Sequence, residues 1–198
     1  MSGQQTCCGA LDLHDGDTKT ADHLAKINCS AFGEYSLYAI VTIASGCGSQ
    51  LQDYEQAEFA GKVVDISQFL IRSGVNLAEQ LMPLSASVCL HTPCSLKNAM
   101  REEQGALKLL QQVPGIKITA LPETIQCCGS AGSYMLKHPK MAEALLDDML
   151  TAANEIKADI LVSSNIGCAL HIAAGLRERG CAMEVVHPVV LIARQLKQ

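Results

Sequence analysis

The chain has 198 residues, a formal net charge of −5 and a hydrophobic content of 48%. This length suffices for one domain or two small ones, and an acidic balance without a Lys/Arg cluster argues against nucleic acid as a partner. Residues 38–44, the longest apolar run, are too few to span a bilayer, and residues 1–6 lack the features of a secretory signal. With ten cysteines, we expect a cytoplasmic protein with reduced thiols, at most peripherally associated with the inner face of the cell membrane.

The chain opens on Cys7-Cys8-Gly9, and the same three residues recur as Cys127-Cys128-Gly129. Adjacent cysteines are poorly suited to bonding each other, because consecutive Cα atoms lie about 3.8 Å apart and an ordinary disulfide needs roughly 4.4 Å or more. The glycine permits a sharp turn or the close approach of a bulky group. Such pairs are suited to presenting thiolates to an inorganic acceptor, and an iron–sulfur cluster is one.

A duplication organises the chain. Three matched pairs lie 120, 121 and 122 positions apart: Cys8 with Cys128, Cys47 with Cys168, and residues 63–66 with residues 185–188. A period this long is too large for a solenoid and indicates two copies of one domain. We therefore predict a first cysteine-rich domain at 1–76 and a second, complete one at 77–198. The first copy has no counterpart of the residues that precede Cys127, so we expect it to be N-terminally truncated.

Hydrophobic periodicity in the second copy predicts alternating strands and helices. The expected strands are 85–91, 116–121, 159–162 and 183–186. The expected helices are 92–113, 139–156, one from Cys168 to about Gly180, and one opened by Pro188. This order is typical of an α/β fold with mostly parallel sheets.

Four cysteines of the second copy lie at or just after predicted strand ends, where α/β sheets carry their functional groups. We assign Cys94, Cys127, Cys128 and Cys168 as ligands of one [4Fe–4S] cluster, which takes four thiolates. Cys89 is a further candidate, with a buried structural role as the alternative. The first copy offers Cys7, Cys8 and Cys47 alone, and we expect that incomplete site to be empty or degraded.

Other groups near these cysteines have both a functional and a structural interpretation. His91 either tunes a ligating sulfur or is a hydrogen-bonded histidine at a strand end, and His171 faces the same region. Backbone N–H groups near Gly129 and Gly167 are expected to influence the cluster. Zinc is the inorganic rival, although adjacent cysteines suit a tetrahedral site less well. Cys29 is expected in the core, and Cys181 is expected to be a small turn residue.

These motifs carry a family resemblance over nearly the whole chain. The paired Cys-Cys-Gly motifs, each followed by a later Gly-Cys, resemble the cysteine-rich CCG domains of heterodisulfide reductase and of iron–sulfur subunits of flavin-linked dehydrogenases. The chain looks most like the C-terminal part of the glycolate oxidase (glycolate dehydrogenase) iron–sulfur subunit. The segments that carry this resemblance are residues 7–14, 44–48, 91–94, 127–132 and 165–171.

The resemblance implies an electron-transfer subunit that serves FAD-containing dehydrogenase subunits and a quinone-type acceptor, and that does not turn over substrate alone. Alternatives within it are a lactate- or glycerol-3-phosphate-type subunit and a heterodisulfide-type thiol/disulfide enzyme. Two departures are visible. The ferredoxin-like cysteine spacing of complete members is missing, and Gln50 and His171 stand where the reductase motif ends in a second cysteine, so its noncubane double cluster is not expected.

Overall fold

The structure, a computed structural model, describes residues 4–197 and contains two parallel β-sheets. The first sheet pairs β1 with β2, and the second has the strand order β4-β3-β5-β6. The strands are β1 Ile40–Thr42, β2 Val63–Asp65, β3 Ser87–His91, β4 Lys117–Ala120, β5 Ile160–Ser163 and β6 Glu184–Val186. The predicted α/β class with parallel sheets is confirmed.

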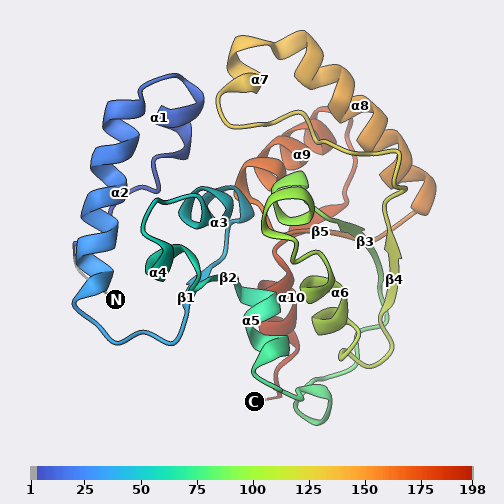
Figure 1. Ribbon diagram of the computed structural model, residues 1–198. Coiled ribbons are helices and arrows are strands. Elements are labelled where there is room, and N and C mark those ends of the chain that lie inside the picture. The colour runs from blue at the N-terminus through green and yellow to red at the C-terminus, as the bar shows by residue number, and fades with distance from the viewer. Residues whose placement is uncertain (1–3, 198) are drawn as a thin grey trace.

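Helices connect the strands and cover the sheets (Figure 1). The first half contains α1 Ala10–His14, α2 Thr18–Gly33, α3 Ser45–Gln52, α4 Ala57–Ala60 and α5 Ile66–Arg72. The second half contains the short helix η1 Ala78–Gln80, the π-helical segment η2 Ser95–Met100, α6 Gln104–Leu110, α7 Tyr134–Lys137, α8 Pro139–Ile156, α9 Ile166–Glu178 and α10 Pro188–Gln195. The order β1-α3-α4-β2-α5 parallels β5-α9-β6-α10, with the short α4 as an addition, as expected of a duplication.

The two central strands of the four-stranded sheet, β3 and β5, are buried on both faces, as their apolar sequences predict. Val88 and Leu90 of β3 pack on one side with α6 and α10, whereas Cys89 between them packs on the other side with α8 and α9. This alternation follows from the twofold side-chain period of a strand. The cysteine-bearing loops at the strand ends therefore follow strands whose centre is well packed.

The first half has a small core of its own around Phe59, which stacks on Tyr54 and meets Phe32 edge to face. Within residues 4–197, β1 pairs with β2 alone, and Ile43 just beyond β1 is 65% exposed. Helix α5 nevertheless packs against the core of the four-stranded sheet through Leu70 and Ile71. The two halves thus share buried apolar surface, and the division at 76/77 stays a prediction.

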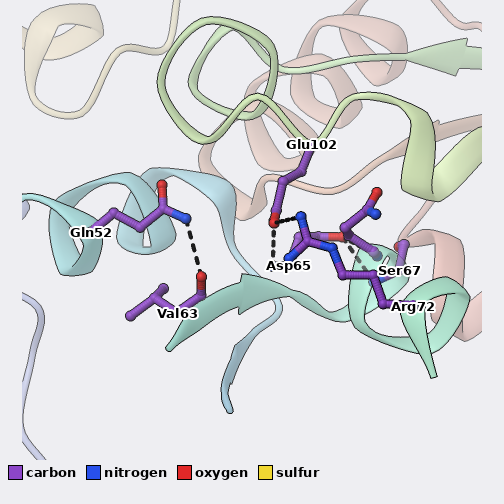
Figure 2. A network of polar contacts seen from close by, with 7 residues as sticks. Gln52, Val63, Asp65, Ser67, Arg72 and Glu102 are labelled. Carbon is purple, nitrogen blue, oxygen red and sulfur yellow. Dashed lines mark hydrogen bonds and ion pairs between the residues drawn. The ribbon is translucent and has the colours of Figure 1, made fainter. Parts of the chain in front are cut away.

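The prediction of one continuous helix over 92–113 is wrong, because the helix is interrupted at Arg101. This residue has a left-handed backbone with φ of +57°, and it separates η2 from α6. The break turns the Glu102 carboxylate into the first half, where it accepts the Asp65 backbone N–H at 2.7 Å and pairs with Arg72 at 3.1 Å (Figure 2). Glu102 is 4% exposed, so this pairing compensates a buried charge.

A second junction joins the equivalent strand ends of the two halves. Asp65 is the last residue of β2 and caps α5 by accepting the N–H groups of Ser67 and Gln68. His187 follows β6 and caps α10 by accepting the Val189 N–H at Nδ1. The two side chains interact electrostatically, and each keeps one buried polar atom without a hydrogen-bond partner. The matched positions therefore share a structural role as helix caps.

This junction predicts an acid sensitivity of the fold. Burial lowers the pKa of His187, with the Asp65 carboxylate as a smaller opposing influence, so the unfolded chain binds more protons as the pH falls below about 6.5. Stability therefore falls on acidification. Between pH 7.5 and 5.5, wild type should lose up to about 1 kcal/mol more than His187→Asn, which keeps an acceptor for the cap. Urea unfolding at both pH values measures this, and parallel profiles for the two proteins would contradict it.

Candidate metal centre

Three adjacent parallel strands bring the second-half cysteines to one edge of the sheet. Cys94 follows β3, Cys127 and Cys128 follow β4, and Cys168 lies in the first turn of α9 after β5. Because neighbouring parallel strands end at the same edge, side chains from distant parts of the sequence meet there. The structure thus brings together the four cysteines singled out from the sequence.

The four sulfurs form a continuous series of contacts. Cys128 Sγ lies 2.8 Å from Cys168 Sγ, and the Cys127 side chain is close enough to those of Cys94 and Cys128 to influence its pKa. The Ser130 hydroxyl adds contacts of 3.5 Å to Cys128 Sγ and 3.9 Å to Cys168 Sγ. Cys128 and Cys168 are 2% and 5% exposed, so this end of the series is closed to solvent.

Mutual hydrogen bonding divides the sulfurs into two classes. Bonds from Cys128 and Cys94 lower the pKa of Cys127, and a bond from Cys128 lowers the pKa of Cys168. The pKa values of Cys94 and Cys128 are raised, first by their bonds to Cys127 and then by other contacts and burial. Four thiolates this close repel one another, so complete ionisation requires a cation among them.

The donor set fits a metal–sulfur centre in its chemistry, although the side chains contact one another directly. Among residues 4–197, no three Cys, His, Asp or Glu side chains are arranged around a point where a metal ion would sit. Binding would therefore require the thiol groups to rotate apart. The backbone that carries them already comes from three strand ends around one location.

Gly129 is required by the Cys-Cys-Gly turn for two reasons. Its φ is +86°, and a Cβ there would overlap the Ala142 carbonyl oxygen and lie 3.0 Å from Ala142 Cα on α8. Its N–H donates to Cys127 Sγ at 3.3 Å, as expected of a group that stabilises a thiolate. Gly9 repeats this geometry in the first half, with φ of +79° and a Cβ position 3.1 Å from Ala21 Cα on α2.

The two histidines differ in their surroundings. His91 is 5% exposed, and its Nδ1 lies 2.9 Å from the Ser163 hydroxyl on the neighbouring strand. Burial lowers the pKa of His91 to about 4, and the nearby Cys127 sulfur opposes that shift. His171 lies with Nε2 3.5 Å from the Ala142 carbonyl oxygen, the same atom that faces Gly129. It therefore supports the backbone beneath the turn.

A helix cap positions Cys168. The Asn165 side-chain oxygen accepts the N–H groups of Gly167 at 2.9 Å and Cys168 at 3.4 Å. The Gly167 N–H thus serves the cap of α9, in contrast to the Gly129 N–H, which reaches a sulfur. Neither Asn165 nor Ser130 was predicted to act at the site, although an asparagine just before a Gly-Cys helix start is a recognisable capping signal.

The remaining cysteines of the second half are separate from this series. Cys89 is fully buried in the middle of β3, and burial raises its pKa to about 11. Cys181 follows the C-terminal end of α9, whereas Cys168 lies in the first turn of that helix, and Cys181 Sγ contacts the Asn154 side-chain oxygen at 3.7 Å. In the first half, Cys29 packs in the small core as expected.

The first half gathers three thiols. Cys8 hydrogen-bonds the side chains of Cys47 and Cys7; the bond to Cys47 and burial raise the pKa of Cys8, while the same bond lowers that of Cys47 to about 7. Backbone oxygens of the pair are anchored, because Asn28 donates to the Cys7 carbonyl at 3.0 Å and Tyr54 to the Cys8 carbonyl at 2.9 Å. The predicted incomplete set thus converges, with three sulfurs.

Comparison with known proteins places this arrangement among cysteine-rich domains. The family model described as CCG, cysteine-rich domain, matches residues 1–52 and 88–173. These ranges include both Cys-Cys-Gly turns, Cys47, Cys94 and Cys168. No helix within residues 4–197 is long and apolar enough to cross a membrane.

Three relatives illustrate the similarity. The probable glycolate oxidase iron–sulfur subunit of Bacillus subtilis (strain 168) is 29% identical over 92% of this chain and 44% of its own length. The glycolate oxidase iron–sulfur subunit of Escherichia coli (strain K12) is 32% identical over 86% and 45%. Lactate utilization protein A of Geobacillus thermodenitrificans (strain NG80-2) is 27% identical over 92% and 80%. The chain thus spans less than half of the two glycolate oxidase subunits.

Proposed function

We propose that this chain, which belongs to the cysteine-rich CCG domain family, is an iron–sulfur electron-transfer module. The cluster is of the [4Fe–4S] type, and Cys94, Cys127, Cys128 and Cys168 are its ligands. The single observation that carries the proposal is the convergence of these four thiols from three strand ends on one location. The names of the similar proteins, two of which are iron–sulfur subunits, support the same chemistry.

The residues of this chain would tune the centre in three ways. The Gly129 N–H donates to Cys127 Sγ and stabilises negative charge on that sulfur, which favours reduction of a bound cluster. The Ser130 hydroxyl contacts two of the sulfurs, and burial of Cys128 and Cys168 excludes water from their side of the site. When bound, the cluster supplies storage of one electron.

The partners follow from the similar proteins. Glycolate and lactate, named in those relatives, are both small 2-hydroxy acids, so the electron donor we propose is a FAD-containing dehydrogenase subunit for such an acid. The acceptor is of the quinone type, with at most peripheral contact between this chain and a membrane. On this proposal the chain relays electrons and leaves substrate turnover to its partner.

One observation favours a second candidate, a thiol–disulfide enzyme. The 2.8 Å contact between Cys128 Sγ and Cys168 Sγ joins two thiols that could together reduce a substrate disulfide. The two would lose two electrons and two protons, form one disulfide, and convert the substrate to two thiols. A metal-free protein that turns over a model disulfide would favour this alternative.

Elemental analysis of anaerobically purified protein tests the proposal. We expect about four iron and four acid-labile sulfide atoms per chain, the content of one cubane cluster. A broad visible absorbance that dithionite bleaches is the expected spectroscopic result. Zinc without iron, or neither metal together with rapid thiol reactivity, would refute it, because the first indicates a structural site and the second a thiol enzyme.

A further inference from the structure

A partly buried hydrogen-bond network joins the two halves beside the candidate metal centre. The Ser45 hydroxyl of α3 lies 2.8 Å from the Ser95 hydroxyl of η2, and the Asn165 side-chain nitrogen donates to both, at 3.2 Å and 3.3 Å. Ser45 is 0% exposed. The Ser45 backbone N–H also donates to the Ser164 carbonyl at 3.2 Å. Both side-chain and backbone hydrogen bonds therefore connect the halves here.

Each member of this Ser45–Ser95–Asn165 clasp is next to a cysteine loop. Ser95 directly follows Cys94, and Asn165 caps the helix turn that carries Cys168. Ser45 belongs to the first half and starts the helix that carries Cys47. The clasp therefore ties two ligand loops of the metal centre to each other and to the first-half cysteine site.

The side-chain donors and acceptor of Asn165 are all used in hydrogen bonds. The Asn165 amide uses both N–H donors on the two hydroxyls and its oxygen on the α9 cap, and the remaining contact joins the two hydroxyls. Small residues permit the close approach: a Cβ on Gly46 would lie 3.1 Å from the Asn165 side-chain nitrogen, and one on Gly48 would overlap the Met100 side chain. A partly buried network whose donors and acceptors are paired in this way favours one arrangement.

We propose that Ser45 is a positioning residue for the metal centre, supplied by the other half of the chain. Through Ser95 and Asn165 it fixes the spacing of the loops that carry Cys94 and Cys168. The part of this inference that concerns a bound cluster rests on the proposed function. The clasp is made of protein groups alone, so part of its test does not depend on the cluster.

The first measurement uses protein that contains its cluster. In Ser45→Ala we expect iron loss to a chelator to be about tenfold faster than in wild type, because the substitution removes both part-buried hydrogen bonds of the Ser45 hydroxyl and the loss of such bonds changes stability by about that factor. The reduction potential should shift as well, which a purely structural role would leave in place. Ser67→Ala is the matched control, because Ser67 is an equally buried first-half serine whose hydroxyl contacts none of the cysteine loops. Its rate should equal that of wild type.

The second measurement uses metal-free protein and does not require the proposed function to hold. Alkylation of individual cysteines, followed by peptide mass spectrometry, should be about tenfold faster at Cys94 and Cys168 in Ser45→Ala. Cys29, in the separate first-half core, should react at the wild-type rate in the same sample. Ser95→Ala, at a partly exposed position, should reproduce the effect if Ser45→Ala does not fold.

The outcomes separate the two proposals. Wild type without iron, combined with faster alkylation in the variant, would refute the cluster and support the clasp. Wild type with iron, combined with unchanged iron release, potential and alkylation in both Ser45→Ala and Ser95→Ala, would overturn the clasp and keep the cluster. Equal acceleration at Cys29 would also overturn it, because that result indicates general loosening of the fold.

Discussion

Cys128→Ser is expected to deprive the protein of most of its bound iron. Cys128 Sγ contacts Cys168 Sγ, and Cys127 hydrogen-bonds it on the other side, so it is central in the series of sulfurs. A serine hydroxyl fills similar space but does not ionise to a soft ligand. Because loss of a partner outside the ligand set already lowers metal affinity about 10- to 100-fold, loss of a ligand should lower it at least as much. Iron and sulfide content per chain measures the effect.

Cys181→Ser is the matched control for this substitution. Cys181 is a partly exposed thiol whose contact is with Asn154, and it takes no part in the sulfur series. Its replacement should leave iron content at the wild-type value. Iron at the wild-type value in both variants would refute the ligand assignment, whereas equal loss of iron from both would indicate that serine substitution damages the fold in general.

Gly129→Ala is expected to destabilise the protein by about 2–5 kcal/mol. About 1–2 kcal/mol of this arises from the left-handed backbone at φ of +86°, which a side chain disfavours. A further ~1–3 kcal/mol comes from overlap with the Ala142 backbone, which belongs to the long helix α8 and has little freedom to move. Urea unfolding of the metal-free protein measures the change in free energy.

Gly180→Ala separates the two causes. Gly180 also has a left-handed backbone, with φ of +66°, but no heavy atom lies within 4 Å of its Cβ position outside its own neighbours. The cost there should be about 1–2 kcal/mol, from backbone conformation alone. If both variants lose the same stability, packing against Ala142 contributes nothing, and the Cys-Cys-Gly turn is less tightly held than its geometry indicates.

The helices and strands of the second half could be predicted because residues close in the sequence determine them. Helix α8 was expected over 139–156 and occupies Pro139–Ile156, since its apolar residues recur at helical spacing after a proline that favours a first turn. The convergence of the second-half cysteines followed from their places after strands of a parallel sheet. In both cases the decisive residues are close in sequence or belong to one regular arrangement.

The break at Arg101 could not be predicted in this way. Residues 92–113 have ordinary helical composition, and the contacts that accompany the break, those of Glu102 with Asp65 and Arg72, involve residues distant in the sequence. The hydrogen bonds of the Ser45–Ser95–Asn165 clasp could not be predicted from the sequence for the same reason. Ser45 and Asn165 are separated by 120 positions, and neither has a local pattern that indicates a hydrogen bond to the other.

The caps at the paired strand ends give the duplicated halves different chemical identities. Asp65 and His187 occupy matched positions, yet one presents an unpaired acceptor oxygen and the other an imidazole N–H. Two identical halves would instead bring carboxylate against carboxylate or imidazole against imidazole, and like groups in a dry interior repel or remain unsatisfied. An exact internal repeat at these two positions would therefore cost stability that the unlike side chains avoid.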